Sequence, residues 1–312
     1  MRDKNLMIGI IGCFAIAVLF VGVIVWEIKK SIEHDERVQQ MAKKANNVEV
    51  SDNRDFSIYE TLVGDDGREM VLVPEGIFSR GSDSGGFDEK PMQEIYLNAF
   101  FVDKYEVSVE AYNKYRKATG YVEPSVPFFQ GDSEVMKVPR HAVVGVSWDD
   151  AVNYCNWAGK RLLTEAEWEK AARGTHGLKY PWGNKILSKR ANLAGTGDGH
   201  AYMGPVGSYP MGRSVYGVYD MAGNVGEWVF DWMPVNENFY LISPEKNPRG
   251  SRPELNACSG VDCVGSYSIT QKVNRGGSWN KKASEMRMAN RMDSHFQLRS
   301  DGTGFRCAAD MK

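Results

Sequence analysis

The sequence has no excess of positive charge. Its 312 residues include 38 Lys and Arg against 40 Asp and Glu, which gives a formal net charge of −2. Proteins that bind nucleic acid usually carry a basic face that neutralises phosphates. The charge balance therefore argues against nucleic acid as a partner.

Signatures of common catalytic and metal sites are also absent. The sequence has no Gly-x-Ser-x-Gly elbow and no zinc motif, and its five histidines are scattered along the chain. The glycine-rich loop at 79–91 lacks the Gly-Lys-Ser/Thr ending of a phosphate-binding loop. The sequence therefore offers no evidence for hydrolase, zinc or nucleotide chemistry of these types.

Cysteine is scarce, whereas hydrophobic residues are not. Five cysteines are too few for a small disulfide scaffold but enough for one or two disulfides, with one cysteine left over. Hydrophobic residues make up 42% of the chain, which is too much for a disordered protein. With 32 glycines, the composition predicts a globular protein rich in loops.

One long hydrophobic run is present at the N-terminus. Residues 6–26 carry no charge, and a helix of this length, at about 1.5 Å per residue, crosses a hydrocarbon core of about 30 Å. We predict a transmembrane helix over 6–26, after a short flank at 1–5, with Cys13 inside the membrane. A lipoprotein signal ending at Cys13 is the alternative, but the apolar residues that follow Cys13 argue against it.

A polar, charged segment separates this helix from the globular part. We predict a stalk or linker over residues 27–66 and a globular domain over residues 67–312. The count of positive residues nominally favours a cytoplasmic C-terminal part. The cysteines of the globular part favour an oxidising compartment, so we expect a periplasmic or otherwise extracytoplasmic domain.

Local patterns within the domain predict several elements. Short apolar strings predict strands at 70–74 and 95–97. Ser108, Ser147 and Thr164 each precede an amphipathic segment and are suited to cap a helix. From 192 to 312 the sequence is rich in turn residues, so we expect bound ions or buried tryptophans to hold it rigid.

Five motifs follow one another along the domain. They are NWAGKRLLTEAEWE at 156–169, YPWG at 180–183, YDMAGNVGEW at 219–228, NRGGSW at 274–279 and GFRCA at 304–308. Together they resemble the formylglycine-generating enzyme, or sulfatase-modifying factor, family over about 240 residues from Met70 onward. The resemblance implies a single α+β domain with little regular secondary structure, related to the C-type lectin fold.

The resemblance does not extend to the catalytic cysteines. In the enzyme, two cysteines shortly after the Gly-Gly-Ser motif bind copper(I) and oxidise a substrate cysteine with O₂. Here Lys281 stands where the first is expected and Met286 near the second. An ammonium group cannot replace a thiolate ligand, and methionines so spaced are typical of a core. We therefore interpret Ser278, Trp279, Lys281 and Met286 as a vestigial active-site region without copper.

Gly226 is a further departure from the family pattern. Relatives commonly carry a tryptophan there, beside the substrate groove. Its loss indicates an altered or absent peptide groove.

The resemblance also bears on the cysteines. Cys155 and Cys307 match a pair that forms a structural disulfide in the enzyme, although they would be free thiols in a cytoplasmic domain. Cys258 and Cys263 lie in an apparent insertion between about 233 and 273. A disulfide that closes this loop is one interpretation of them, and a relocated redox or metal pair is the other.

Two calcium sites are implied by the same resemblance. The first would use the Asn192 side chain, the Leu193 carbonyl, the Asp198 carboxylate and the His200 carbonyl. The second would use Asp220, the carbonyls of Gly223 and Val225, and Glu227. Calcium prefers such mixtures of carboxylate, amide and backbone oxygens. The alternative is that Asp220 and Glu227 cap turns.

These observations lead to one main hypothesis and two alternatives. The main hypothesis is a membrane-anchored extracytoplasmic domain that acts without catalysis, as a binding, assembly or regulatory subunit with a protein partner in a membrane or envelope complex. The first alternative is an oxidase that converts a protein cysteine to formylglycine, or performs a related oxidation, with ligands not recognised in the sequence. The second is a carbohydrate- or peptide-binding module, suggested by the lectin-like fold.

Overall fold

The computed structural model describes residues 59–126, 133–195, 199–234, 240, 243–250 and 267–311, together with 26, 29 and 32. The predicted membrane helix, apart from Trp26, lies outside these residues, as do Cys13, Asp198 and the pair Cys258 and Cys263. Within the described residues, no helix has the length and apolar character needed to cross a membrane.

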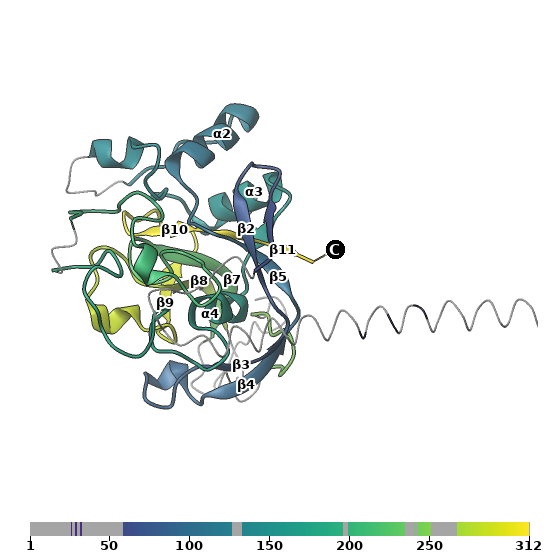
Figure 1. The fold of residues 1–312 in the computed structure, drawn as a ribbon. Helices are drawn as coiled ribbons and strands as arrows, with labels where there is room; N and C mark the ends of the chain where they lie inside the picture. Colours follow the sequence, from purple (N-terminus) through teal and green to yellow (C-terminus); the bar gives the residue numbers. More distant parts are fainter. Residues whose placement is uncertain are drawn as a thin grey trace, which may run out of the picture.

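The described strands form three sheets (Figure 1). A five-stranded sheet has the order β1 (Thr61–Val63), β2 (Glu69–Val73), β5 (Phe100–Asp103), β11 (Cys307–Asp310) and β6 (Arg161–Leu162). A four-stranded sheet has the order β10 (Thr303–Phe305), β7 (Gly226–Pro234), β8 (Tyr267–Arg275) and β9 (Met292–His295). β3 (Gly76–Arg80) and β4 (Gln93–Leu97) form a hairpin. Every pairing is antiparallel except that of β10 with β7.

Three α-helices accompany these sheets in the described part of the chain. They are α2 (Val109–Thr119), α3 (Trp148–Trp157) and α4 (Glu165–Arg173), and short 3₁₀ helices occupy Phe87–Glu89, Ser133–Lys137, Pro210–Gly212 and Ala283–Met286. In Figure 1, α2 and α3 lie at one end of the domain and the β3–β4 hairpin at the other. The result is an α+β fold in which long irregular segments join short elements.

The capping residues begin the helices as predicted. The Ser108 hydroxyl accepts a hydrogen bond from the Ala111 amide at the start of α2. Ser147 and Thr164 each form a reciprocal box with the acidic residue three positions later, which satisfies amides that have no partner inside the helix. The predicted strands are also present, at Glu69–Val73 and Gln93–Leu97.

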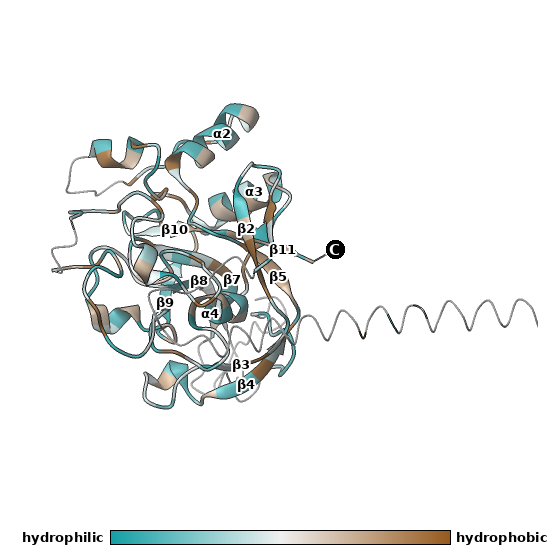
Figure 2. Cartoon of the chain, in the orientation of Figure 1, coloured by the Kyte–Doolittle hydropathy of each residue, from teal (hydrophilic) through white to brown (hydrophobic). Residues whose placement is uncertain are grey.

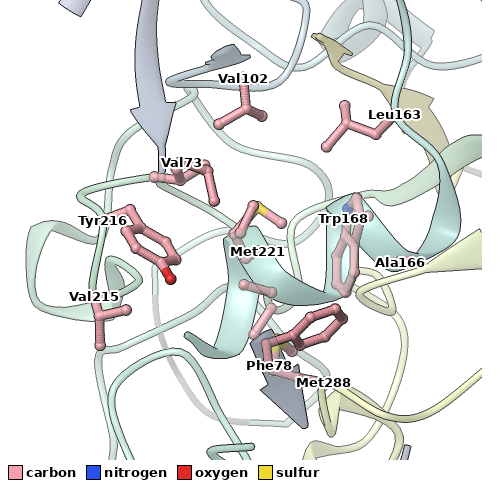
Figure 3. Packing of buried hydrophobic residues seen from close by; sticks show 14 of the residues in the cluster. Val73, Phe78, Val102, Leu163, Ala166, Trp168, Val215, Tyr216, Met221 and Met288 are labelled. Atoms are coloured by element: carbon pink, nitrogen blue, oxygen red, sulfur yellow. The ribbon is translucent and has the colours of Figure 1, made fainter. Parts of the chain in front are cut away.

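The main core lies between α4 and the sheets. Trp168 on α4 is fully buried among apolar side chains from β2, β3 and β5 and from the loop after β8, and Figure 3 shows Phe78, Met221 and Met288 in this cluster. Figure 2 shows hydrophobic residues along β5, all four of whose side chains are buried. This packing fixes α4 against β3, β7 and β8.

A disulfide joins α3 to β11. The bond links Cys155 to Cys307, the pairing that the family resemblance implies, and their Cα atoms lie 5.7 Å apart. Both residues are fully buried in a second core with Tyr112, Tyr154 and Phe305. The bond connects positions 152 residues apart, so the chain-entropy model assigns it about 5 kcal/mol of stabilisation.

The turn-rich C-terminal part contains more regular structure than the sequence indicates. The four-stranded sheet lies entirely within 226–305, and its strands β7 and β8 are nine residues long. In β7, buried Glu227 and Asp231 lie among hydrophobic residues, so the usual apolar-polar alternation of a strand is absent. Register shifts between Trp228 and Pro234 interrupt the pattern further.

Candidate binding site

The family's copper-binding positions lie just after β8. The chain turns there through Gly276 and Gly277, whose φ angles of 93° and 73° suit glycine. The Ser278 hydroxyl donates to Asn280 Oδ1, and the Trp279 ring nitrogen donates to the Asp301 carbonyl. The turn is thereby fixed against the loop before β10.

Lys281 and Met286 lie in different surroundings. The Lys281 ammonium is at the surface, 3.5 Å from Glu285 Oε1, with its side chain 43% exposed. Met286 is buried in the main core, and a Cβ at Gly277 would lie only 2.4 Å from its sulfur. Among the described residues, the only cysteines are Cys155 and Cys307, which are joined to each other. The described part of the site therefore presents no thiolate for copper(I).

A cavity of about 400 Å³ opens beside this turn. Its walls come from the turn, the β8 and β9 strands and the loop before β10, and they include Asn274, Ser278, Asn280, Lys281, Ser294 and Thr303. Ser300 adds a further hydroxyl, and Arg291 and Asp293 add charged groups. Such walls suit a polar ligand rather than an apolar one.

Asn274 is the most buried polar side chain that lines the cavity. This side chain is 2% exposed, and its Nδ2 donates to Thr303 Oγ1 at 3.2 Å. Its Oδ1 is buried and accepts no hydrogen bond from any described residue. A buried acceptor without a donor costs about 1–3 kcal/mol, so the site favours a ligand or water that donates to this oxygen.

Gly226 makes room for this amide. A Cβ built on Gly226 would lie 2.4 Å from Asn274 Oδ1, so no larger residue fits without displacing the amide. Both residues line the cavity. The sequence singles out Gly226 as a departure from the family, but the consequence depends on Asn274, which sequence reasoning missed.

A buried ionic network lies behind the site. Arg275 contacts Glu169 at 2.6 Å and Glu165 at 3.3 Å, and it donates to the carbonyls of Met288 and Ala289. Arg291 also pairs with Glu165, at 2.7 Å. Burial raises the pKa of Glu165, but the two guanidinium groups outweigh it and hold that pKa below its usual value. The network fixes the loop between β8 and β9, which forms one side of the cavity.

One predicted calcium ligand is suitably placed. Asn192 is buried, and its Nδ2 donates to the Tyr202 carbonyl and to Asn224 Oδ1, whereas its Oδ1 has no hydrogen-bond partner among the described residues. An amide oxygen left without a donor is a typical cation ligand. Leu193 and His200 are described and Asp198 is not, so the residues present fit the first site as far as they are described.

The second predicted calcium site is arranged differently. The Glu227 carboxylate accepts from Arg306 at 2.7 and 2.8 Å and from the Trp168 ring nitrogen at 2.9 Å. Asp220 Oδ2 accepts from the Gly207 amide at 2.6 Å. Within the described ranges, no group of three or more His, Cys, Asp or Glu side chains is arranged to hold a metal. The Glu227 carboxylate is therefore occupied by two side chains, neither of them in a turn that Glu227 would cap, and it does not fit a calcium ligand.

Burial affects the acids around Arg306. It raises the pKa of Asp220 to about 6, although the Gly207 amide and Arg306 oppose the shift. Burial and the neighbouring carboxylates of Asp220 and Glu227 raise the pKa of Glu106 well above its usual value. Glu106 accepts from the Asn224 side chain and the Val225 amide, so it positions the turn that precedes β7.

Comparison with known proteins places these features in context. The family described as "Sulfatase-modifying factor enzyme 1-like domain" matches residues 58–311. The formylglycine-generating enzyme of Thermomonospora curvata is 33% identical over 316 residues, covering 82% of this chain and 98% of that protein. The structure of PvdO from Pseudomonas aeruginosa superposes with a TM-score of 0.65 at 28% identity, covering 81% of this chain and 98% of PvdO.

A second group of relatives is much longer. The serine/threonine-protein kinase pkn1 of Chlamydia caviae is 35% identical over 260 residues, which cover 78% of this chain. The match covers only 38% of that kinase. The chain therefore resembles one part of a larger protein.

Proposed function

Because the chain belongs to the sulfatase-modifying factor enzyme 1-like domain family, we propose that it uses the family fold as a non-catalytic binding domain. The observation that carries this proposal is the environment of Lys281 and Met286. One is a surface ammonium paired with Glu285, and the other is a core side chain. Neither supplies the thiolate that copper(I) oxidation requires in this family.

The cavity supports a binding role in place of that chemistry. Its walls combine hydroxyl and amide side chains with the charged groups Lys281, Arg291 and Asp293, and it retains a buried acceptor on Asn274. These groups hold a ligand by hydrogen bonds, and none of them is a redox centre. The ionic network behind the cavity keeps its walls in place before a ligand arrives.

We also propose that the domain is extracytoplasmic and anchored by a helix over 6–26, as a binding, assembly or regulatory subunit of a membrane or envelope complex. The disulfide between Cys155 and Cys307 supports an oxidising compartment, where such bonds persist. The uncharged run at 6–26 supports the anchor. The partner in this proposal is another protein of the same membrane or envelope.

For calcium, the proposal is restricted to the first site. Asn192 Oδ1, the carbonyls of Leu193 and His200, and the Asp198 carboxylate would hold the ion. Calcium bound there would neutralise the Asp198 carboxylate. The ion would also cross-link the residues before and after Asp198 that act as its ligands. The unpartnered Oδ1 of Asn192 supports this assignment.

The central experiment is a copper(I) titration of the purified full chain, followed by turnover of a cysteine-containing peptide in the presence of O₂. The expected result is no tight copper binding and no O₂-dependent loss of peptide thiol. The Thermomonospora curvata enzyme serves as the positive control. Tight copper binding together with thiol oxidation would establish the oxidase alternative and overturn the non-catalytic proposal.

A further inference from the structure

The cavity lies on one face of the four-stranded sheet. Residues directly opposite each other in an antiparallel ladder point to the same face. Trp232, Lys272 and Ser294 form one such row across β7, β8 and β9. Asn274 and Met292 are opposite each other in the next row along. Because Asn274 and Ser294 both line the cavity, the two rows place Trp232 and Lys272 beside it.

Aromatic rings surround Lys272 on this face. Its ammonium lies 3.7 Å from the ring centre of Trp148 and 3.8 Å from that of Trp232, and it donates to the Phe230 carbonyl at 2.8 Å. The Phe296 ring lies 6.0 Å from that of Trp232. We call Trp148, Phe230, Trp232 and Phe296 the aromatic ridge.

The ridge is held in place but is not covered by the described chain. Lys272 Nζ packs against two of its rings, and the contact is a cation–π interaction in the protonated form; burial lowers the pKa of this group to about 7. Phe230 is 36% exposed, and Trp148, Trp232 and Phe296 are partly exposed. Rigid aromatic faces of this kind provide contact area with little loss of side-chain entropy.

The cavity and the ridge offer complementary chemistry. In the cavity, Ser278, Asn280 and Thr303 present hydroxyl and amide groups, and Asn274 Oδ1 lacks a donor. Of the three charged groups that line the cavity, Lys281 is paired with Glu285 and Arg291 with Glu165, and Asp293 is exposed. A ligand suited to both parts has many hydroxyl groups around its edge and apolar C–H groups on a flat face.

We propose that this face binds a saccharide, with one sugar in the cavity donating a hydroxyl hydrogen to Asn274 Oδ1 and the next sugar lying against the aromatic ridge. This inference rests on the proposed non-catalytic binding function and adds a saccharide as the ligand of this face, separate from the protein partner. Asn274 is the residue that selects a hydroxyl donor, because a ligand without one leaves the buried oxygen unpaired. This position of the Asn274 amide requires glycine at 226, because a side chain there would displace the amide.

The test is calorimetric titration of the full chain with cellotetraose, chitotetraose and maltotetraose. At least one of them is expected to bind saturably, with a Kd below about 1 mM. Asn274→Leu, which removes the acceptor at similar volume, is expected to weaken that binding by about tenfold or more. Trp232→Ala, which removes part of the ridge, is expected to do the same and remains informative if Asn274→Leu does not fold.

Matched controls lie at the C-terminal end of α3, about 12 Å along the helix from Trp148, the residue of α3 that belongs to the ridge. Asn156 and Trp157 are both exposed, so Asn156→Leu and Trp157→Ala are expected to leave saccharide binding unchanged. The inference is overturned if none of the three saccharides binds, if binding is insensitive to both site variants, or if an extended peptide occupies the face instead. Absence of saccharide binding without copper-dependent thiol oxidation would reject this inference alone, whereas such oxidation would reject the proposed function.

Discussion

Arg275 on β8 lies 2.6 Å from Glu169 on α4, and both side chains are fully buried. The same carboxylate accepts from Arg173 and from the Gly81 amide through its other oxygen. The pair therefore joins the sheet that carries the candidate site to α4 and to the loop after β3. Because each ion is desolvated, the loss of one partner leaves the other uncompensated.

Glu169→Gln is expected to destabilise the fold by about 3–5 kcal/mol, the range for breaking a buried ion pair. Urea denaturation of the variant and the wild type measures this difference. The exposed pair of Lys114 and Glu110 on α2 provides the control, and Glu110→Gln should change stability by less than about 1 kcal/mol. Similar effects of the two variants would show that the buried pair does not hold the sheet to α4.

Reduction of the disulfide between Cys155 and Cys307 is expected to lower the stability of the fold strongly. Reduction, or replacement of Cys155 and Cys307 by Ala, is expected to lower stability by up to about 5 kcal/mol, because the unfolded chain then regains the freedom that the cross-link removes. Thermal unfolding with and without a reductant measures the effect. The Ala variant is the control, because any response of its unfolding to the reductant comes from elsewhere, including a disulfide between Cys258 and Cys263. An unchanged melting temperature of the wild type on full reduction would contradict the prediction.

The sequence predicts local features of this fold better than distant ones. Helix starts at Ser108, Ser147 and Thr164 depend on side chains within three residues, so they are visible in the sequence. The four-stranded sheet is not predicted from the sequence, because buried acids in β7 interrupt the alternation of apolar and polar residues that indicates a strand. Family resemblance predicts the pairing of Cys155 with Cys307, whereas their spacing alone does not.

In the candidate site, too, the sequence predicts some residues and not others. Lys281, Met286 and Gly226 stand out in the sequence because they depart from a family motif. Asn274 does not stand out in the sequence. Its importance depends on the folded structure, in which Gly226 on the neighbouring strand leaves room for the Asn274 amide and no described residue donates to its Oδ1. Tertiary contacts decide which polar residue of such a segment lacks a partner.

Calcium removal provides a test of the first proposed metal site. Adding calcium to chelator-treated protein is expected to raise the melting temperature, because an ion that binds only the native state stabilises it by mass action. Asn192→Leu should abolish the shift, since it removes the unpartnered Oδ1. Asn156→Leu, at an exposed position on α3, is the control and should retain it. A calcium shift that persists in Asn192→Leu would place the ion elsewhere.

The raised pKa of Asp231 on β7 makes the stability of the fold depend on pH. Its carboxylate accepts from the Glu165 and Gly250 amides, with Glu165 and Lys272 as charged neighbours. Burial, reinforced by the Glu165 carboxylate, raises its pKa to about 6, although the two amides and Lys272 oppose the shift. The folded state therefore binds a proton more tightly here than the unfolded state, whose aspartate has a pKa of about 3.9. Between pH 4 and pH 6, this group makes the protein more stable as the pH falls.

Denaturation of wild type and Asp231→Asn at several pH values isolates this contribution. The difference in stability between the two proteins should change by about 2 kcal/mol between pH 7 and pH 4, in favour of the wild type at low pH. This is less than the full effect of the pKa shift, because the unfolded aspartate is itself about half protonated at pH 4. Asp149→Asn is the control: burial and the Asp150 carboxylate also raise the pKa of Asp149, but this side chain is exposed, so the difference should change less with pH. A constant difference between wild type and Asp231→Asn over this range would mean that Asp231 ionises as it does in the unfolded chain.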